Sequence, residues 1–367
     1  MDQVMNIVFR SDASLSIGHG HVMRCLTLAS ALRDCGAAVS FVCREHDGHL
    51  CELIEERGFA VSRLPARTAG TRAEDTPGHA AWLGAPWQED AEQTCAIMEA
   101  SGAKPDWLVV DQYALDHRWE SAMRSSVGRI MVIDDLADRV HDCDLLLDQN
   151  LVAQMETRYL DLVPVRCHLM LGPDYALLQP IYGQLRAGIA PREGPVRRIL
   201  IFFGGVDSDN LTGRTLAAFL QLDRPDIEAD VVVSAGSPHA VAIREQVAGH
   251  RNIHLHSGLP TLAPLMVKAD LGIGGGGATS WERFCLGLPT LVVTLADNQR
   301  PVTENLYAQG LIHWIGDREQ ADLRTISESL ARALELNSLR DWSSRCLQIC
   351  TGQGVSRVST FMMTALG

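Results

Sequence analysis

The chain has 367 residues, of which 46% are hydrophobic and 21% are charged. This composition provides enough apolar material for two domains or one large one, and it excludes disorder as the main state. Because 45 acidic residues outnumber 32 basic ones and leave a formal net charge of −13, we expect no nucleic-acid partner. No run approaches the roughly 18 apolar residues of a transmembrane helix, so we expect no membrane insertion.

Two further features bear on the cellular compartment. The N-terminal sequence MDQVMNIVFR has neither the basic stretch nor the long apolar stretch of a secretory signal, so export is not expected. The ten cysteines are scattered without a CxxC pair, mostly within apolar patterns, where a free thiol behaves as a small hydrophobic group. These features predict a cytoplasmic protein with reduced cysteines.

Short runs of Val, Ile and Leu alternate along the chain with stretches of helical periodicity, which is typical of parallel sheets covered by helices. The fold class is therefore α/β. In the first half we predict strands at Asn6–Arg10, Ala38–Cys43, Trp107–Asp111, Arg129–Ile133 and Leu145–Leu147, and helices near Val22–Arg33, His49–Arg57, Ala91–Ser101 and Arg118–Ser125. These elements predict one doubly wound, Rossmann-like sheet.

The segment Tyr182–Arg198 loses this periodicity and gathers Gly, Pro and Arg, as linkers between domains do. We therefore predict one domain at 1–185 and a second at 196–367. In the second domain we predict strands at Ile199–Phe203, Asp230–Ser234, Ile253–Leu255, Leu271–Ile273 and Thr290–Thr294, helices near Asn210–Leu220, Ala240–Ala248, Ala278–Leu286 and Val302–Gln309, and a helical tail over Glu319–Leu366. Two such sheets predict a ligand cleft between them, because open α/β sheets bind ligands at the carboxyl ends of their strands.

The loop after the first predicted strand carries a Gly-x-Gly turn, Gly18 and Gly20, which allows a ligand close to the backbone. Met23 stands where a dinucleotide fingerprint requires its third glycine, which argues against a dinucleotide site. His21 lies at the start of the following helix, where the positive end of the helix dipole favours a neutral ring that can accept a proton. A packing or capping histidine, or a metal pair with His19, are the alternatives.

The second predicted domain has a stronger signal, four glycines that lead from a strand into a helix. Free N–H groups at such a turn bind anions, and no Lys follows at the spacing of a triphosphate-binding loop. We therefore predict a diphosphate at Gly275, Gly276, Gly277 and Ala278, with hydroxyl contacts from Thr279 and Ser280. Glu282 follows one helical turn later, placed for ribose hydroxyls. Glycines used only for tight turning are the alternative.

Polar residues follow several other predicted strands, at the edge of the sheet where ligands bind. In the first domain these are Asp111 with Tyr113, and the pair Asp134 and Asp135. In the second domain they are Gly204 and Gly205 of FFGGVDSDN, and Asn298 and Gln299 of LADNQRP. For any one of these residues, a role in an ordinary solvated loop or helix cap is an equal alternative to contact with a ligand.

Several ordered segments, among them RSDASLSIGHGHVMRCLTLASAL, VVDQYALD, FFGGVDSDNLT and GGGGATSWERFCLGLPTLVVTLADNQ, resemble the PseG family of UDP-sugar hydrolases. The family is similar to MurG-like glycosyltransferases of the two-domain GT-B architecture. The resemblance implies hydrolysis of UDP-2,4-diacetamido-2,4,6-trideoxy-β-L-altropyranose to UDP and the free sugar in pseudaminic acid biosynthesis, by attack of water at the anomeric carbon. It places the general base on His21 and the ribose ligand on Glu282, and it matches Asn298 to the asparagine of the A-D-N-Q loop.

The complete predicted site follows from these two lines of reasoning. His21 is the catalytic residue; the expected sugar contacts are Asp12, Gly18, Gly20, Tyr113, Asn298 and Gln299; the expected UDP contacts are Gly204, Gly205, Gly275, Gly276, Gly277, Ala278, Thr279, Ser280 and Glu282. We expect no metal and no cofactor. A glycosyltransferase that uses a UDP-sugar donor, and a catalytically silent nucleotide-sugar sensor, are the alternatives. The oligomeric state is left open.

Overall fold

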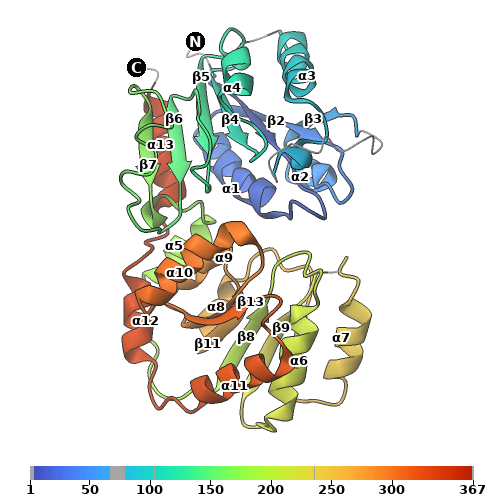
Figure 1. Cartoon of the computed structure of the whole chain (residues 1–367), viewed down its shortest axis with the longest axis vertical. Helices are drawn as coiled ribbons and strands as arrows, with labels where there is room; N and C mark the ends of the chain where they lie inside the picture. The colour runs from blue at the N-terminus through green and yellow to red at the C-terminus, as the bar shows by residue number, and fades with distance from the viewer. Residues whose placement is uncertain (1–3, 67–78, 103, 235, 366–367) are drawn as a thin grey trace. The chain divides into compact units, whose positions relative to one another are not determined.

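The computed structural model describes residues 4–66, 79–102, 104–234 and 236–365 (Figure 1). The chain divides into two compact units. Unit 1 comprises Met1–Asn150, Gln154–Leu177 and Gly354–Gly367, and unit 2 comprises Leu151–Ala153 and Leu178–Gln353.

These bounds differ from the predicted division at 1–185 and 196–367 in two respects. The predicted linker belongs to unit 2, where it forms helix α5 (Pro180–Arg186) and places Arg192 against three backbone carbonyl groups, those of Met266, Ala269 and Leu286. The last helix, α13 (Gly354–Thr364), belongs to unit 1 because its apolar face joins the core of that unit. The Trp107 indole also donates a hydrogen bond to the carbonyl of Met362 at 3.2 Å.

Unit 1 contains one parallel sheet of seven strands in the order β3-β2-β1-β4-β5-β6-β7. Its strands are β1 (Asn6–Ser11), β2 (Ala38–Arg44), β3 (Ala60–Leu64), β4 (Trp107–Asp111), β5 (Arg129–Ile133), β6 (Leu145–Asp148) and β7 (His168–Leu171). All five strands predicted for this half are confirmed, and β3 and β7 at the two edges were not predicted.

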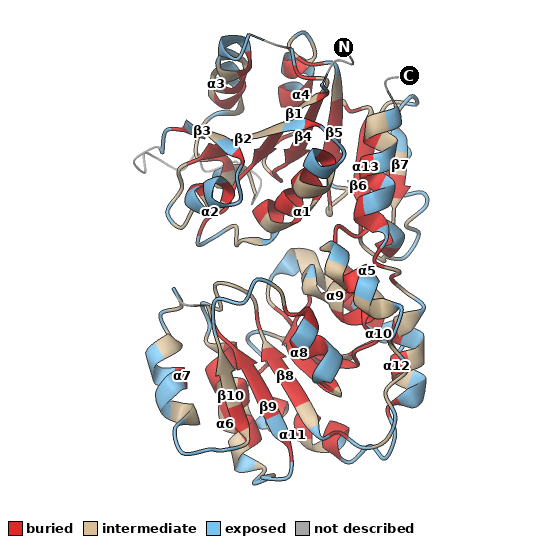
Figure 2. Cartoon of the chain, turned by 180° about the vertical axis from the view of Figure 1, so that it is seen from behind, coloured by how far each residue is buried: buried red, intermediate tan, exposed pale blue. Residues whose placement is uncertain are grey.

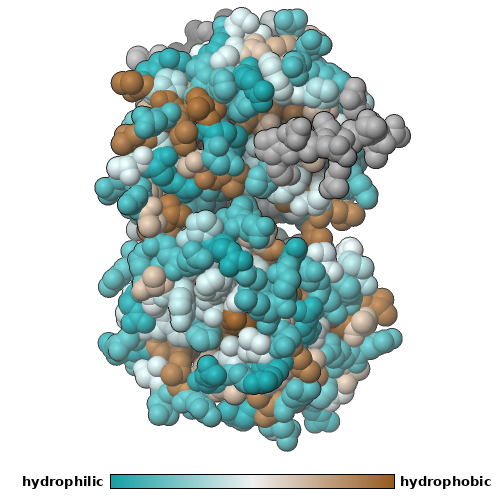
Figure 3. All heavy atoms as spheres, viewed as in Figure 1, coloured by the Kyte–Doolittle hydropathy of each residue, from teal (hydrophilic) through white to brown (hydrophobic). Residues whose placement is uncertain are grey.

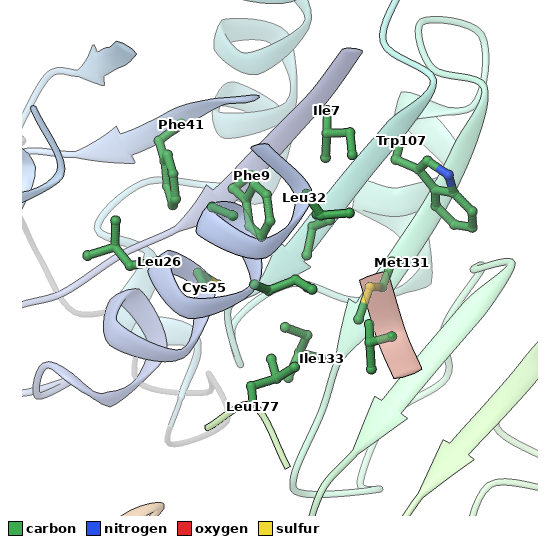
Figure 4. Close-up of a cluster of buried hydrophobic side chains, with 14 of the residues drawn as sticks. Ile7, Phe9, Cys25, Leu26, Leu32, Phe41, Trp107, Met131, Ile133 and Leu177 are labelled. Carbon is green, nitrogen blue, oxygen red and sulfur yellow. The ribbon is translucent and has the colours of Figure 1, made fainter. Parts of the chain in front are cut away.

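Helices cover both faces of this sheet, as alternation of side chains along each strand requires. The helices are α1 (Gly20–Asp34), α2 (Cys51–Glu56), α3 (Trp87–Ala100), α4 (His117–Met123) and α13, with short 3₁₀ turns η1 (Ala80–Leu83) and η2 (Pro173–Tyr175). Alternate residues of β1 divide between two cores: Ile7 and Phe9 pack with α1, α2 and α13, whereas Val8 packs with α3 and α4. Figure 4 shows Leu26 of α1 near Phe9 and Phe41 of adjacent strands.

Unit 2 repeats the arrangement with six parallel strands in the order β10-β9-β8-β11-β12-β13. The strands are β8 (Arg198–Phe202), β9 (Glu228–Val232), β10 (Ile253–His256), β11 (Leu271–Gly275), β12 (Thr290–Thr294) and β13 (His313–Asp317). The helices are α5, α6 (Leu211–Gln221), α7 (Ala240–Val247), α8 (Ala263–Lys268), α9 (Thr279–Cys285), α10 (Arg300–Ala308), α11 (Leu323–Leu334) and α12 (Arg340–Leu347), with the 3₁₀ turn η3 (Asp297–Gln299). Figure 2 shows buried residues concentrated on the central strands of this sheet.

Each sheet has a point where the chain reverses its direction of travel across the strands. In unit 1 this point lies between β1 and β4, and in unit 2 between β8 and β11. Loops that leave neighbouring strands in opposite directions at such a point open a crevice, which is where open α/β sheets hold ligands. The sheet order therefore directs attention to the loops after these four strands.

Within the described ranges, no helix is long and apolar enough to span a bilayer. Hydrophilic residues predominate on the face of the chain that Figure 3 presents, as expected for a chain with a formal net charge of −13.

Candidate active site

His21 forms a hydrogen-bonded pair with Asp111. The Nδ1 atom of His21 lies 2.6 Å from Oδ1 of Asp111, and both side chains are largely buried. The fold creates this contact because β1 pairs with β4 in parallel, so that Ser11 and Asp111 are neighbours and α1 begins close to the end of β4. A carboxylate at Nδ1 holds the proton on that nitrogen, which leaves the lone pair of the neutral ring on Nε2.

Arg24 holds the Asp111 carboxylate from the other side. It lies three residues after His21 on α1, so both side chains share one helix face. Its Nε and Nη2 atoms donate to Asp111 at 2.6 and 2.7 Å, and its Nη1 atom donates to Asp135 at 2.5 Å. Although burial raises the pKa of Asp111, the charge of Arg24 and the hydrogen bonds from Arg24 and His21 hold this pKa well below its usual range. Asp111 is therefore a permanent anion behind the His21 ring.

Tyr113 packs against the same imidazole, but it is buried. Its ring centre lies 4.4 Å from that of His21 in an edge-to-face arrangement, and its hydroxyl donates to Asp135 at 2.5 Å. Burial and the Asp135 carboxylate raise the pKa of this hydroxyl, which stays protonated. Tyr113 lies beside the predicted base, but only 6% of its surface is exposed, and its contact with a sugar stays a prediction.

Asp12 was predicted to contact the sugar, and the structure gives it an internal role. Its Oδ1 atom accepts hydrogen bonds from the Arg10 side chain at 2.6 Å and from the Arg44 backbone at 2.7 Å. Its Oδ2 atom accepts from the Gln112 side chain at 2.8 Å. The residue is only 1% exposed. Because both oxygens are satisfied by the protein, the structure argues against direct contact with a ligand.

The Gly-x-Gly turn before α1 has the conformation that glycine favours. Gly18 has φ of +82°, and its N–H donates to the carbonyl of Ser14 at 2.8 Å. Gly20 opens α1 and is exposed, with no heavy atom of a neighbour within 4 Å of the place where a Cβ would lie. His19 between them is partly exposed, and burial lowers its pKa. The backbone beside His21 thus has open space around it, and contact of Gly18 and Gly20 with a ligand stays a prediction.

The glycine-rich turn of unit 2 is explained partly by packing. Strand β11 continues to Gly275, two residues beyond its predicted end. A Cβ on Gly275 would lie 2.6 Å from the Leu295 side chain, and one on Gly276 would lie 2.8 Å from Thr303 Oγ1. Packing therefore accounts for these two glycines. Gly277 has more room, because the atom nearest to a Cβ placed on it would be Gln299 Nε2, at 3.5 Å.

The part of this turn that remains accessible is Gly277–Thr279. Ala278 is exposed, and the residues on either side of it are partly exposed. Amide groups at the first turn of a helix have no intrahelical partner, so this backbone can donate to an anion. Gln299 belongs with it, because its Nε2 atom points toward Gly277 while its Oε1 atom accepts from the backbone of Leu295 at 3.1 Å. The neighbouring Asn298 is partly exposed in η3, and its contact with a ligand stays a prediction.

Ser280 was predicted to contact the diphosphate through its hydroxyl, but this hydroxyl faces the interior of the unit. Ser280 is 1% exposed, and its Oγ atom accepts a hydrogen bond from Nη2 of Arg283 at 2.9 Å. The same nitrogen donates to the carbonyl of Gly275 at 2.6 Å. Burial lowers the pKa of Arg283 to about 10, so the guanidinium stays charged at neutral pH. Arg283 and Ser280 therefore brace the turn from inside.

Glu282 has an unsatisfied carboxylate oxygen. Its Oε2 atom is buried and has no hydrogen-bond partner among the described residues. Burial raises the pKa of Glu282 to about 7, although the adjacent Tyr182 hydroxyl and Arg283 oppose this shift. A buried acceptor without a donor is costly, so such an atom is typical of a site that a ligand completes. A ribose hydroxyl is a donor of the required kind.

Gly204 and Gly205 follow β8, on the other side of the same reversal point. Gly204 has φ of +99°, and both residues are partly exposed. The amides of Leu211 and Thr212 at the start of α6 are already bound by the Asp207 carboxylate, at 2.8 and 3.0 Å. An anion there would meet a like charge. Contacts from Gly204 and Gly205 to UDP stay a prediction.

Sequence reasoning selected His21, Glu282 and the polar strand ends as candidates, but it did not select Arg24, Arg283 or Tyr182, which lie beside them. For Arg24 the available signal was an arginine inside an otherwise apolar helix pattern. In the portions of the chain that the structure describes, His, Cys, Asp and Glu side chains form no group of three or more that could hold a metal ion.

Comparison with known proteins identifies the relatives of the chain. No family model matches it. The UDP-2,4-diacetamido-2,4,6-trideoxy-β-L-altropyranose hydrolase of Campylobacter jejuni is 27% identical over 309 residues, which cover 83% of this chain and 97% of the relative. The chain resembles the PseG family. This finding confirms the resemblance that the sequence motifs indicated.

The matches to two other relatives cover a smaller share of each relative's length. An uncharacterised protein of Methanocaldococcus jannaschii is 23% identical over 303 residues, or 81% of this chain. The spore coat polysaccharide biosynthesis protein SpsG of Bacillus subtilis is 28% identical over 193 residues, or 52% of this chain. The chain spans 57% of the length of each of these two relatives.

Solved structures confirm the predicted GT-B architecture. MurG of Acinetobacter baumannii matches with a TM-score of 0.65 at 15% identity, covering 98% of this chain and 99% of that one. The rhamnosyltransferase SpnG, solved with thymidine diphosphate, matches with a TM-score of 0.60 at 17% identity, covering 99% and 100%. UGT89C1 of Arabidopsis thaliana, solved with UDP, matches with a TM-score of 0.64 at 11% identity, covering 98% and 99%. At these identities the likeness concerns the fold alone.

Proposed function

We propose that the chain hydrolyses a UDP-sugar, UDP-2,4-diacetamido-2,4,6-trideoxy-β-L-altropyranose, to UDP and the free sugar. The observation that carries the proposal is the His21–Asp111 pair, a histidine whose Nδ1 is held by a buried carboxylate at 2.6 Å. This arrangement prepares Nε2 to take a proton from water. The resemblance to the Campylobacter jejuni hydrolase along 97% of that enzyme supports the choice of reaction.

In the proposed reaction, His21 activates the attacking water. The Nε2 atom removes one proton as the water oxygen bonds to the anomeric carbon, and the bond between that carbon and the diphosphate oxygen breaks. UDP leaves with the electron pair, and the proton passes from His21 to solvent. Asp111 stabilises the imidazolium that forms, because a buried anion interacts strongly with an adjacent cation. A positioned base contributes roughly 10²–10⁴-fold to such a rate.

The nucleotide is assigned to unit 2. The amides of Gly277–Thr279 would bind the diphosphate and stabilise the charge that it gains on leaving. The Oε2 atom of Glu282, which is buried without a partner, would accept a hydrogen bond from the ribose. We place the reaction in the cytoplasm. The ten cysteines, all among the described residues, form no disulfide, which supports this assignment because reduced thiols are typical of that compartment.

The first prediction concerns the reaction itself. Incubation of the purified protein with the UDP-sugar in buffer that contains EDTA should release UDP and free sugar in equal amounts, because the proposed base and anion site consist of protein groups alone. In H₂¹⁸O the released UDP should contain no ¹⁸O by mass spectrometry, since water attacks carbon and not phosphorus. A strict requirement for a divalent cation, or ¹⁸O in UDP, would contradict this mechanism.

The same assay separates hydrolysis from sugar transfer. A glycosyltransferase of this architecture would release UDP only slowly in buffer and faster with an acceptor, whereas the proposed hydrolase needs only water. If UDP release depends on an added acceptor, the transferase interpretation replaces the present one. UDP binding without turnover would instead indicate a nucleotide-sugar sensor.

The second prediction concerns Glu282 and pH. Its pKa is about 7 in the unliganded protein, and a ribose hydroxyl that donates to the carboxylate would lower it. UDP affinity should therefore rise as the pH increases toward 7 and level off above it, because the carboxylate form binds better. Glu282→Gln should weaken UDP binding by about 1–3 kcal/mol at pH 8, the cost of an impaired buried hydrogen bond.

Calorimetric titrations between pH 5.5 and 8.5 with wild type and Glu282→Gln measure this effect. The ionisation of UDP itself appears in both titrations, so the difference between them reports Glu282 alone. Glu228→Gln is the matched control, since Glu228 is exposed at the start of β9. Equal UDP affinity of wild type and Glu282→Gln at every pH would place the nucleotide elsewhere.

A further inference from the structure

Four aromatic rings of unit 1 form one cluster, which includes the ring of His21. Trp82 of η1 stacks on Tyr113, with ring centres 5.8 Å apart and ring planes 24° from parallel. His79 lies against Trp82 edge-to-face, with ring centres 4.7 Å apart. The ring centres of Trp82 and His21 are 6.5 Å apart, and the two ring planes are nearly perpendicular. The cluster thus surrounds one side of the imidazole that is assigned as the base.

The members of this cluster differ in how much surface they offer. Tyr113 is 6% exposed, its hydroxyl is bound to Asp135, and the Arg139 guanidinium lies over its ring at 5.9 Å. Trp82 and His79 are both partly exposed. Trp82 therefore presents the larger accessible ring next to His21, whereas Tyr113 supports it from behind.

An accessible indole beside a catalytic base has a specific use in a sugar site. A polar sugar face needs hydrogen-bond donors and acceptors, whereas a tryptophan ring offers mainly an apolar surface. The ring consequently suits substituents that end in methyl groups. The proposed substrate carries three of these, the methyls of two acetamido groups and the C6 methyl of a 6-deoxy sugar.

We propose that Trp82, with His79 at its edge, packs against the methyl-bearing substituents of the sugar and so selects acetamido and 6-deoxy sugars over fully hydroxylated ones. This inference rests on the proposed function for the identity of the sugar. Trp82 acts as a specificity residue here, and proton transfer stays with His21.

Two measurements test the role of Trp82. The first is saturation-transfer NMR with the free 2,4-diacetamido-2,4,6-trideoxy sugar, in which the wild-type protein should transfer magnetisation strongly to the methyl protons. Trp82→Ala should abolish that transfer and Trp82→Phe should retain part of it, because a smaller ring keeps some of the apolar contact. The second is steady-state kinetics, where Trp82→Ala should lower kcat/KM for the UDP-sugar by about 10- to 100-fold while the inhibition constant of UDP stays unchanged.

Trp87→Ala is the matched control, because Trp87 is also a partly exposed tryptophan of unit 1 but contacts the Arg118 guanidinium, 5.5 Å from its ring centre. This variant should keep the methyl transfer, and thermal melting of both variants checks folding. Trp82→Ala with wild-type methyl transfer, or with kcat/KM within twofold of wild type, overturns the proposal. A loss of UDP affinity in Trp82→Ala also overturns it, since the ring would then hold the nucleotide.

The design separates this inference from the proposed function. Methyl transfer that depends on Trp82, in a protein that releases no UDP, would support the sugar contact and contradict the hydrolase. Normal hydrolysis by Trp82→Ala would support the hydrolase and contradict the sugar contact. Absence of methyl transfer in the wild-type spectrum also counts against the proposal.

Discussion

Replacing His21 with asparagine should reduce kcat by roughly two to four orders of magnitude, the range expected for loss of a positioned general base. The amide N–H of asparagine can still donate a hydrogen bond to Asp111, but the amide cannot take a proton from water at neutral pH. UDP affinity should change little, because the proposed nucleotide contacts lie in unit 2. Measuring kcat together with the UDP dissociation constant therefore tests both assignments.

His19 provides the control for this experiment. It lies two residues away and is partly exposed at the start of α1, but no described hydrogen bond holds its ring. His19→Asn should therefore stay within a few-fold of wild-type kcat. If His19→Asn were inactive and His21→Asn active, the assignment of the base would be wrong even though the family resemblance would stand.

The sequence predicted the central strands of both sheets well, and the strands that it missed lie at sheet edges. Trp107–Asp111, Arg129–Ile133 and Thr290–Thr294 were predicted with the bounds that the structure has. These strands are buried on both faces, so each reads as a continuous apolar run. The three strands that were missed, β3, β7 and β13, all lie at sheet edges, where partly exposed residues interrupt the pattern.

The unit to which the last helix belongs could not be predicted. The apolar spacing of Val355, Val358 and Met362 indicates a helix with one buried face. That spacing says nothing about which of two cores receives the face, because the choice depends on the path of the chain after α12. The same limit explains the misplaced linker, since the arginine-rich composition of 182–198 conceals packing of Arg192 onto backbone carbonyls.

The candidate site shows the same division between local and long-range information. A helix start with an adjacent glycine turn marked His21, and a strand end marked Asp111, because both signals are local. Their contact joins residues that lie 90 positions apart in the sequence, and it depends on β1 and β4 being neighbours in the sheet. Asp12 shows the opposite case, because a polar residue after a strand can be satisfied internally by donors that are distant in sequence, here the backbone of Arg44 and the side chain of Gln112.

Replacing Asp111 with asparagine should lower kcat by roughly 10²–10⁴-fold with little change in UDP affinity. The neutral amide can donate to Nδ1 of His21, which favours the tautomer with the proton on Nε2 and removes the lone pair that must face water. It also cannot stabilise the imidazolium that forms during reaction. In ¹⁵N NMR spectra of histidine-labelled protein, the His21 signals of wild type should report a proton on Nδ1, and those of Asp111→Asn a proton on Nε2.

Asp135→Asn separates this effect from a loss of stability. Both carboxylates bind Arg24, so either variant leaves a buried guanidinium with one fewer partner and should lower the melting temperature. Only Asp111 contacts His21, and therefore Asp135→Asn should keep the Nδ1–H tautomer and most of kcat at a temperature where both variants are folded. If the two variants lost kcat equally while folded, the Arg24 network as a whole would position the site, and the specific role of Asp111 in orienting His21 would be wrong.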